Sequence, residues 1–170
     1  MKVALNVSEE SGDSDAHIFT DENINKIERV LEQEIHELLP NLCEFDSCEI
    51  SVMITTPENI RELNRTYRNV DEATDVLSFP MIEPDSGSDS GLKSEFVCPV
   101  LALGDIVICP SEVARLHSDL EFHEAMYLMI AHSFLHLLGW DHDTHEKESE
   151  MWQRQEIIKN KFLANNSEVL

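Results

Sequence analysis

Three histidines near the end of the chain have the types and spacing to bind a metal ion, in the sequence His132-Ser-Phe-Leu-His136-Leu-Leu-Gly139-Trp-Asp-His142. On a helix, His132 and His136 lie one turn apart on the same face. Gly139 stands where a helix needs a left-handed exit residue, so the chain can turn back and bring His142 to the same point. Three imidazoles hold a zinc ion and leave its fourth position open for water, which the ion activates. The spacing therefore predicts one catalytic Zn²⁺ per chain, held by His132, His136 and His142.

A histidine in an apolar helix is by default a core or surface residue that binds nothing. Three histidines at this spacing around a glycine favour a metal centre over that alternative. The remaining histidines have no such partner spacing. His145 is expected to be exposed, and surface positions or local packing are expected for His17, His36, His117 and His123.

The spacing HxxxHxxGxxH also occurs in the metzincin proteases, which carry a glutamate directly after the first histidine as the general base. This chain has Ser133 at that position. A serine hydroxyl cannot take a proton from a metal-bound water near neutral pH. A metallopeptidase is therefore an alternative that the spacing favours and Ser133 disfavours.

Three arginines, Arg61, Arg65 and Arg68, follow one another along one stripe of a short predicted helix. An arginine fork fits two phosphate oxygens at once, so this stripe is a candidate for binding a phosphate. For Arg61 and Arg65, a solvated helix face paired with Glu58 and Glu62 is the preferred interpretation. Arg68 remains the candidate for contacting substrate, and a surface pair with Asp71 or Glu72 is its alternative.

The elements that must position these residues follow from hydrophobic periodicity and from turn residues. Strands are predicted at Lys2–Val7, Cys48–Thr56, Val76–Pro80 and Leu103–Cys109. Helices are predicted from an N-cap at Thr20 to Leu38, and at Pro57–Arg68, from Pro110 onward, at Phe122–Leu138 and at Thr144–Leu163. Together they predict an α+β fold in a single domain, 1–170. Its small mixed sheet has about four strands packed with about five helices, one central and buried. Acidic loops are expected near 8–17 and 83–100, and a frayed C-terminus after about residue 163.

Charge limits the partners that the chain can have. The 170 residues include 12 bases and 34 acids, a net charge of −22. This balance argues against bulk attraction to nucleic acid or anionic lipid, although it leaves room for a local basic groove. No apolar run is long enough to span a bilayer, and Met1–Glu10 lacks the apolar segment of a secretory signal. The four cysteines form no CxxC pair and are expected to be reduced thiols in the cytoplasm.

The order and spacing of several segments resemble the bacterial YbeY-type endoribonucleases, which are rRNA maturation factors. The matching segments are LNRTYRNVDEATDVLSFP at 63–80, LGDIVICP at 103–110, HSFLHLLGWDHD at 132–143 and the following helix EKESEMWQRQEII. The resemblance implies a mixed sheet flanked by helices and a metal, usually zinc, on His132, His136 and His142. It also implies hydrolytic cleavage of RNA, and it places the arginine of the family's first motif at Arg68.

The sequence thus predicts a cytoplasmic, zinc-dependent, single-strand-specific endoribonuclease. Its expected roles are late maturation of the 3′ end of small-subunit rRNA and ribosome quality control. Arg68 is the predicted catalytic residue, because it would steady the phosphate charge as it develops. The expected partners are an rRNA precursor and the ribosome or small-subunit proteins, with no membrane. Besides the metallopeptidase, the other alternative is a ribosome-assembly binding factor in which the metal is only structural.

Overall fold

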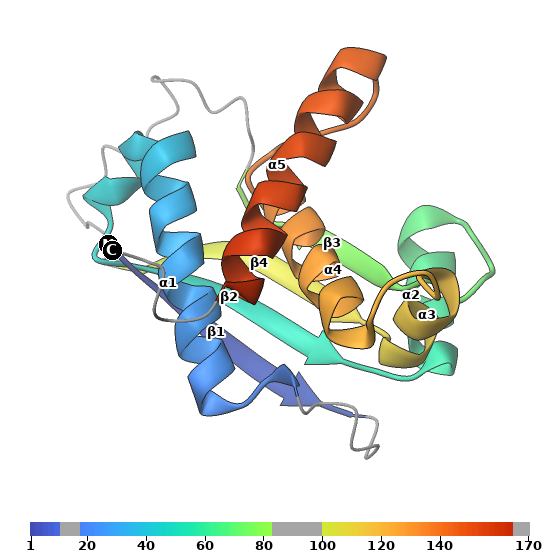
Figure 1. The fold of residues 1–170 in the computed structure, drawn as a ribbon. Helices are drawn as coiled ribbons and strands as arrows, with labels where there is room; N and C mark the ends of the chain where they lie inside the picture. Colours follow the sequence, from blue (N-terminus) through green and yellow to red (C-terminus); the bar gives the residue numbers. More distant parts are fainter. Residues whose placement is uncertain (11–17, 83–99, 165–170) are drawn as a thin grey trace.

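A computed structural model of the chain describes residues 1–10, 18–82 and 100–164. Within these ranges it contains a short 3₁₀-helix at Pro40–Glu44. Its strands are β1 (Lys2–Glu9), β2 (Ser47–Ile54), β3 (Val76–Pro80) and β4 (Val100–Ile108). Its helices are α1 (Asp21–Leu38), α2 (Pro57–Arg68), α3 (Pro110–Leu116), α4 (Phe122–Leu137) and α5 (His145–Leu163) (Figure 1).

The four strands form one mixed sheet in the order β1-β2-β4-β3. β1 and β4 both run parallel to β2, whereas β3 lies antiparallel to β4 and forms one edge of the sheet. The register between β2 and β4 shifts between Glu49 and Ile50, where β4 has one extra residue, Leu103, as in a β-bulge. The predicted α+β class, the mixed sheet and the number of strands and helices are confirmed.

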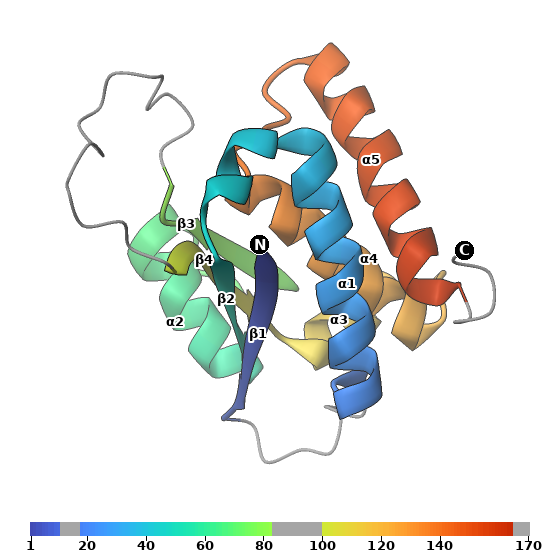
Figure 2. The same cartoon turned by 90° about the vertical axis from the view of Figure 1, so that its left-hand side faces the viewer.

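Helices cover the sheet on both faces. α1, α4 and α5 pack on one face and form the larger core together with the inward side chains of the strands. On the other face, α2 contributes Ile60 to a smaller core with Leu77, Val107 and Cys109. Figure 2 shows the sheet between these two layers. The edge strand β3 therefore has side chains in contact with α2 on one face and with the α4 layer on the other.

The central buried helix is α4. Eleven of its 16 residues are buried, which is typical of a helix that is apolar on all sides. Its half-buried histidines, His132 and His136, interrupt this apolar surface near the C-terminal end. A helix buried this deeply holds its side chains in narrow rotamer ranges, so it is a rigid support for ligands.

The helix ends are set by local chemistry. Thr20, Thr56 and Thr144 are N-caps whose hydroxyls accept the backbone N–H three residues later, at 3.3–3.4 Å. Pro57 occupies the first turn of α2. Backbone N–H groups in the first turn have no partner within the helix, so proline loses no hydrogen bond there. Asn69 ends that helix with φ +58°, a left-handed conformation that asparagine tolerates.

Two strands extend further than the sequence predicts. β1 continues through Glu9, two residues into the predicted loop at 8–17, because it pairs with β2 up to Ile54. β4 begins at Val100 rather than Leu103, because Val100 and the next two residues pair with the start of β2. Glu10 is described as well, and its N–H donates to the carbonyl of Ile54. Residues 11–17 and 83–99 of the two predicted loops and the predicted frayed end at 165–170 lie outside the described residues. Within the described residues, no helix combines the length and apolarity needed to cross a membrane.

Candidate metal centre

His132 and His136 face each other across one turn of α4. Their Nε2 atoms are 3.1 Å apart. Two ligands of a tetrahedral zinc ion, each about 2.0–2.1 Å from the metal, lie about 3.3 Å from one another. The predicted pair of helical ligands is therefore placed at a separation close to the one that a shared metal ion requires.

A tight turn after α4 brings the third histidine to the same place. Gly139 has φ +84°, and its N–H donates to the carbonyl of His136 while the N–H of Trp140 donates to that of Leu135. His142 then returns toward the helix. One nitrogen from each of His132, His136 and His142 lies within 4.8 Å of the other two. The three predicted ligands are thus brought together, with His142 on the exposed side of the group.

Hydrogen bonds on the outer nitrogens orient the two helical rings. His136 Nδ1 donates to the backbone carbonyl of Trp140 at 2.9 Å, and His132 Nδ1 donates to Gln155 Oε1 at 3.0 Å. With both Nδ1 atoms protonated, each neutral ring presents an Nε2 lone pair to the other. Two lone pairs 3.1 Å apart repel unless a cation lies between them. The donor set therefore fits a metal ion, and the outer partners are of the kind that fix metal-binding histidines.

Burial keeps these rings neutral. Desolvation, reinforced by the neighbouring His132, lowers the pKa of His136 from 6.5 to about 4. The pKa of His132 is also lowered, mainly by burial. A neutral imidazole is the form that binds a metal, so protons compete little with an ion at this site near neutral pH.

Gln155, the partner of His132, was not among the predicted site residues. It lies on the buried side of α5, only 4% exposed, in a row with Met151, Ile158 and Phe162. A glutamine within an otherwise apolar helix stripe is the sequence signal that could have revealed it. Its position depends on the docking of α5, to which several ion pairs contribute. The fully buried Glu34 of α1 forms ion pairs with Arg154, at 2.5 Å, and with Lys161, at 2.6 Å.

Arg68 lies apart from the histidines, at the end of α2. Its Nη2 donates to the backbone carbonyl of Ser78 on the edge strand β3 at 3.2 Å. Asp71, the surface partner that the alternative interpretation assigned to it, binds Arg61 instead at 2.9 Å. Among the described residues, no carboxylate pairs with Arg68, which leaves most of its guanidinium donors open. Arg65 pairs with Glu62 as expected, whereas Arg61 prefers Asp71 to Glu58.

The edge strand connects Arg68 to the metal centre. Ser78, which holds Arg68, is followed by Phe79, whose carbonyl lies 2.3 Å from the point where a Cβ on Gly104 would stand. The side chain of Leu137, next to His136, lies 2.9 Å from the same point. The C-terminal turn of α4 therefore meets β3 directly beside the residue that anchors Arg68.

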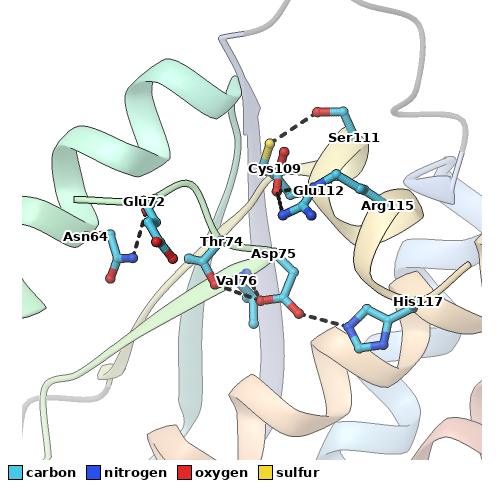
Figure 3. Close-up of polar contacts among 10 residues, drawn as sticks. All are labelled: Asn64, Glu72, Thr74, Asp75, Val76, Cys109, Ser111, Glu112, Arg115 and His117. Carbon is cyan, nitrogen blue, oxygen red and sulfur yellow. Dashed lines mark hydrogen bonds and ion pairs between the residues drawn. The ribbon is translucent and has the colours of Figure 1, made fainter. Parts of the chain in front are cut away.

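A second polar pair lies at the start of this strand. His117 Nε2 is 2.8 Å from Asp75 Oδ2, and both side chains are largely buried (Figure 3). Asp75 Oδ1 also accepts the N–H of Val76 and the hydroxyl of Thr74. The charge of Asp75 raises the pKa of His132, and the charge of His117 lowers the same pKa. The pair therefore lies within electrostatic reach of the three histidines. Local packing was one of the two positions that the sequence predicted for His117, and the structure shows it. Asp75 was not among the predicted site residues.

Two cavities flank these elements. A groove of about 880 Å³ between α2 and α3 is lined by three arginines, Arg61, Arg65 and Arg115, together with five acids. Its net charge is therefore negative, and none of the three histidines lines it. A smaller cavity of about 290 Å³ lies under the turn that follows α4 and is lined in part by Gly139, Trp140 and Asp141. None of the three histidines lines this cavity either.

Comparison with known proteins gives the family. The family model described as endoribonuclease YbeY matches residues 12–163. The chain belongs to the endoribonuclease YbeY family. Endoribonuclease YbeY from Shouchella clausii is 42% identical over 122 residues, which cover 71% of this chain and 76% of the relative. Endoribonuclease YbeY from Brevibacillus brevis is 44% identical over 120 residues, covering 65% of this chain and 72% of the relative.

A solved structure supports the fold. The solution structure of TM1509 from Thermotoga maritima matches with a TM-score of 0.58 at 23% identity, and the match covers 94% of this chain and 89% of that one. The YbeY family consists of endoribonucleases that function in rRNA maturation, so the predicted family and reaction class are confirmed. The metallopeptidase and the binding factor with a structural metal are not supported. Ser133, at the position of the metzincin base, is fully buried and cannot reach a water on the open side of the histidines.

Proposed function

We propose that this YbeY-family chain is a zinc-dependent endoribonuclease specific for single-stranded RNA. Its substrate is the precursor of small-subunit rRNA, which it trims at the 3′ end late in maturation, and it takes part in ribosome quality control. The observation that carries the metal dependence is the pair of Nε2 atoms 3.1 Å apart, each oriented by a hydrogen bond on the far side of its ring. The same site is proposed to hold one ion per chain, with His142 as its third ligand.

Bound zinc would supply a water of lowered pKa and a positive charge near the scissile phosphate. The residues of the chain have separate tasks. His132, His136 and His142 hold the ion from one side. Gln155 and the Trp140 carbonyl keep the two helical rings turned toward it.

Arg68 is proposed to bind the phosphate. Its hydrogen bond to Ser78 fixes the side chain along the edge of β3, and no carboxylate in the described part of the chain pairs with its guanidinium. A preorganised cation of this kind stabilises the charge that develops on phosphate oxygens as the phosphodiester is cleaved. The ion pairs of Arg61 and Arg65 with neighbouring acids make these two residues weaker candidates for the same role.

The charge of the chain implies that RNA binding is local. At a net charge of −22, most of the surface repels phosphate, so few contacts hold the substrate and the salt dependence of binding is shallow. Docking on the ribosome or on basic small-subunit proteins would concentrate the enzyme on its target. We therefore place it in the cytoplasm with the ribosome.

The decisive experiment combines metal analysis with RNA cleavage. Purified wild-type protein should contain about one zinc per chain, and it should cleave a single-stranded RNA but not the matching duplex, with activity lost to a chelator and regained with zinc. His136→Ala should lose both the metal and the cleavage. His123→Ala is the matched control, because His123 is exposed on the same helix and should retain both. Full zinc content in His136→Ala, or cleavage of casein rather than RNA, would overturn the proposal.

A further inference from the structure

Tyr67 is an aromatic residue with an unusual degree of exposure. It lies in the last turn of α2 with 61% of its surface open to solvent. One contact holds its ring: Phe79 of β3 meets it edge to face, with ring centroids 5.2 Å apart and planes at 73°. Within the described residues, its hydroxyl makes no hydrogen bond. The ring is therefore positioned but mostly uncovered.

The neighbouring residue adds a cation that docks on the same edge strand. Tyr67 and Arg68 are consecutive, and they dock on consecutive residues of the edge strand: Tyr67 on the Phe79 ring and Arg68 on the Ser78 carbonyl. The ring keeps an open surface, and within the described ranges the guanidinium has no carboxylate partner. An exposed aromatic ring together with an arginine is the combination that holds a base and its phosphate in single-stranded nucleic acid.

Strand β3 links this pair to the C-terminal turn of α4. The Phe79 carbonyl and the Leu137 side chain both approach Gly104, at 2.3 and 2.9 Å from its Cβ position, and Leu137 follows the ligand His136. A strand of RNA whose phosphate reaches Arg68 would place a neighbouring base over Tyr67, at the sheet edge that the C-terminal turn of α4 also contacts.

Trp152 provides an internal contrast. It is equally exposed, at 59%, on α5. The arginine nearest to it in sequence, Arg154, is engaged by Glu34 and Glu37, and three acids, Glu148, Glu150 and Glu156, lie within four residues of Trp152 on α5. Exposure of an aromatic ring is therefore not enough to indicate a site for an RNA base. Tyr67 is the better candidate because Arg68, next to it in sequence, has no carboxylate partner among the described residues.

We propose that Tyr67 is a stacking platform for an unpaired base of the RNA substrate, next to the phosphate bound by Arg68. The inference rests on the proposed function and adds the residue that recognises single strands. A base inside a duplex has both faces covered by its neighbours, so it cannot lie on Tyr67 without leaving the stack. Preference for unpaired RNA then follows from the position of this ring.

The test uses the zinc-loaded full chain and a short single-stranded RNA, with binding followed by fluorescence anisotropy and cleavage by gel. Tyr67→Ala should weaken binding and raise KM about tenfold, as expected for the loss of one base–aromatic stack, while kcat, zinc content and Tm stay near wild type. Tyr67→Phe should bind as wild type, because stacking needs the ring and not the hydroxyl. Trp152→Ala is the matched control for loss of an exposed aromatic and should leave binding unchanged.

Abasic substitutions in the RNA identify the stacked base. Removing that base should weaken wild-type binding about as much as Tyr67→Ala does, and it should have no further effect on the alanine variant. Wild-type affinity in Tyr67→Ala, an equal loss in Tyr67→Phe, or additive losses with every abasic RNA would overturn the stacking role while cleavage by the wild type continues. Wild-type protein that neither binds nor cleaves RNA would instead overturn the proposed function, and the stacking role with it.

Discussion

Replacing Gly104 with alanine should destabilise the protein strongly, because the new methyl group has no space. Gly104 has φ +146°, a conformation that L side chains rarely adopt. Its Cβ would lie 2.3 Å from the Phe79 carbonyl oxygen and 2.9 Å from the Leu137 side chain. The leucine can rotate away, but the carbonyl belongs to β3, which is paired with β4 at this point. The strand pair itself must therefore shift.

The size of the effect follows from two terms. Backbone strain at such a dihedral costs about 1–3 kcal/mol, and forcing a methyl group into a filled site costs about 1–3 kcal/mol more. Together they give about 2–6 kcal/mol, a large share of the roughly 5–15 kcal/mol that keeps a domain folded. At a site without strain, the same substitution would stabilise the protein by about 0.4–1 kcal/mol, because alanine lowers the conformational entropy of the unfolded chain. The sign of the change thus separates the two cases.

Urea unfolding monitored by circular dichroism is the appropriate assay, with the midpoint compared at constant m-value. Ala102→Gly, at an exposed position two residues earlier on β4, is the control for a glycine–alanine difference in the same strand and should lose at most about 1 kcal/mol. Because Leu137 adjoins His136, the Gly104→Ala variant should also bind zinc more weakly than wild type. A Gly104→Ala protein as stable as wild type would refute the argument from this contact.

Three further predictions concern the site. Arg68→Ala should cleave RNA about a hundredfold more slowly with zinc content and Tm unchanged, and Arg68→Lys should not restore the rate, since a point charge cannot grip two oxygens; wild-type turnover in the alanine variant would remove Arg68 from the active site. Gln155→Leu should lower zinc affinity about 10- to 100-fold through loss of the His132 partner, measured by competition with a chromophoric chelator, and unchanged affinity would contradict that role. In metal-free protein, the pKa of His136 falls from 6.5 in the unfolded chain to about 4 in the folded one, and that of His132 is lowered as well. Stability should therefore be complete above pH 6.5 and decline as the pH falls toward 4, because the unfolded chain then binds more protons; urea midpoints that do not change over this range would contradict the burial of these rings.

Elements that are defined by nearby residues could be predicted closely. α2 and β3 have the predicted bounds, because Pro57 and the Thr56 cap define one end of the helix and the following polar turn defines the other. The extents of β1 and β4 could not be predicted in the same way. Their extra residues, such as Val100, are strand only because β2 offers unpaired backbone groups beside them. Such pairing depends on chain segments that are far apart in sequence.

The clustering of the three histidines proposed as metal ligands was determined by the sequence itself, since all three lie within eleven residues. Helical periodicity aligns His132 with His136, and the left-handed turn at Gly139 returns His142, so no distant segment is needed to assemble them. The tertiary structure decided everything that surrounds them. The docking of α5 supplies Gln155, the strand β3 holds Arg68 and Tyr67, and competition for Asp71 determines which arginine remains open. Each of these outcomes is a contact between separate elements, whose partners only the packing of the folded chain brings together.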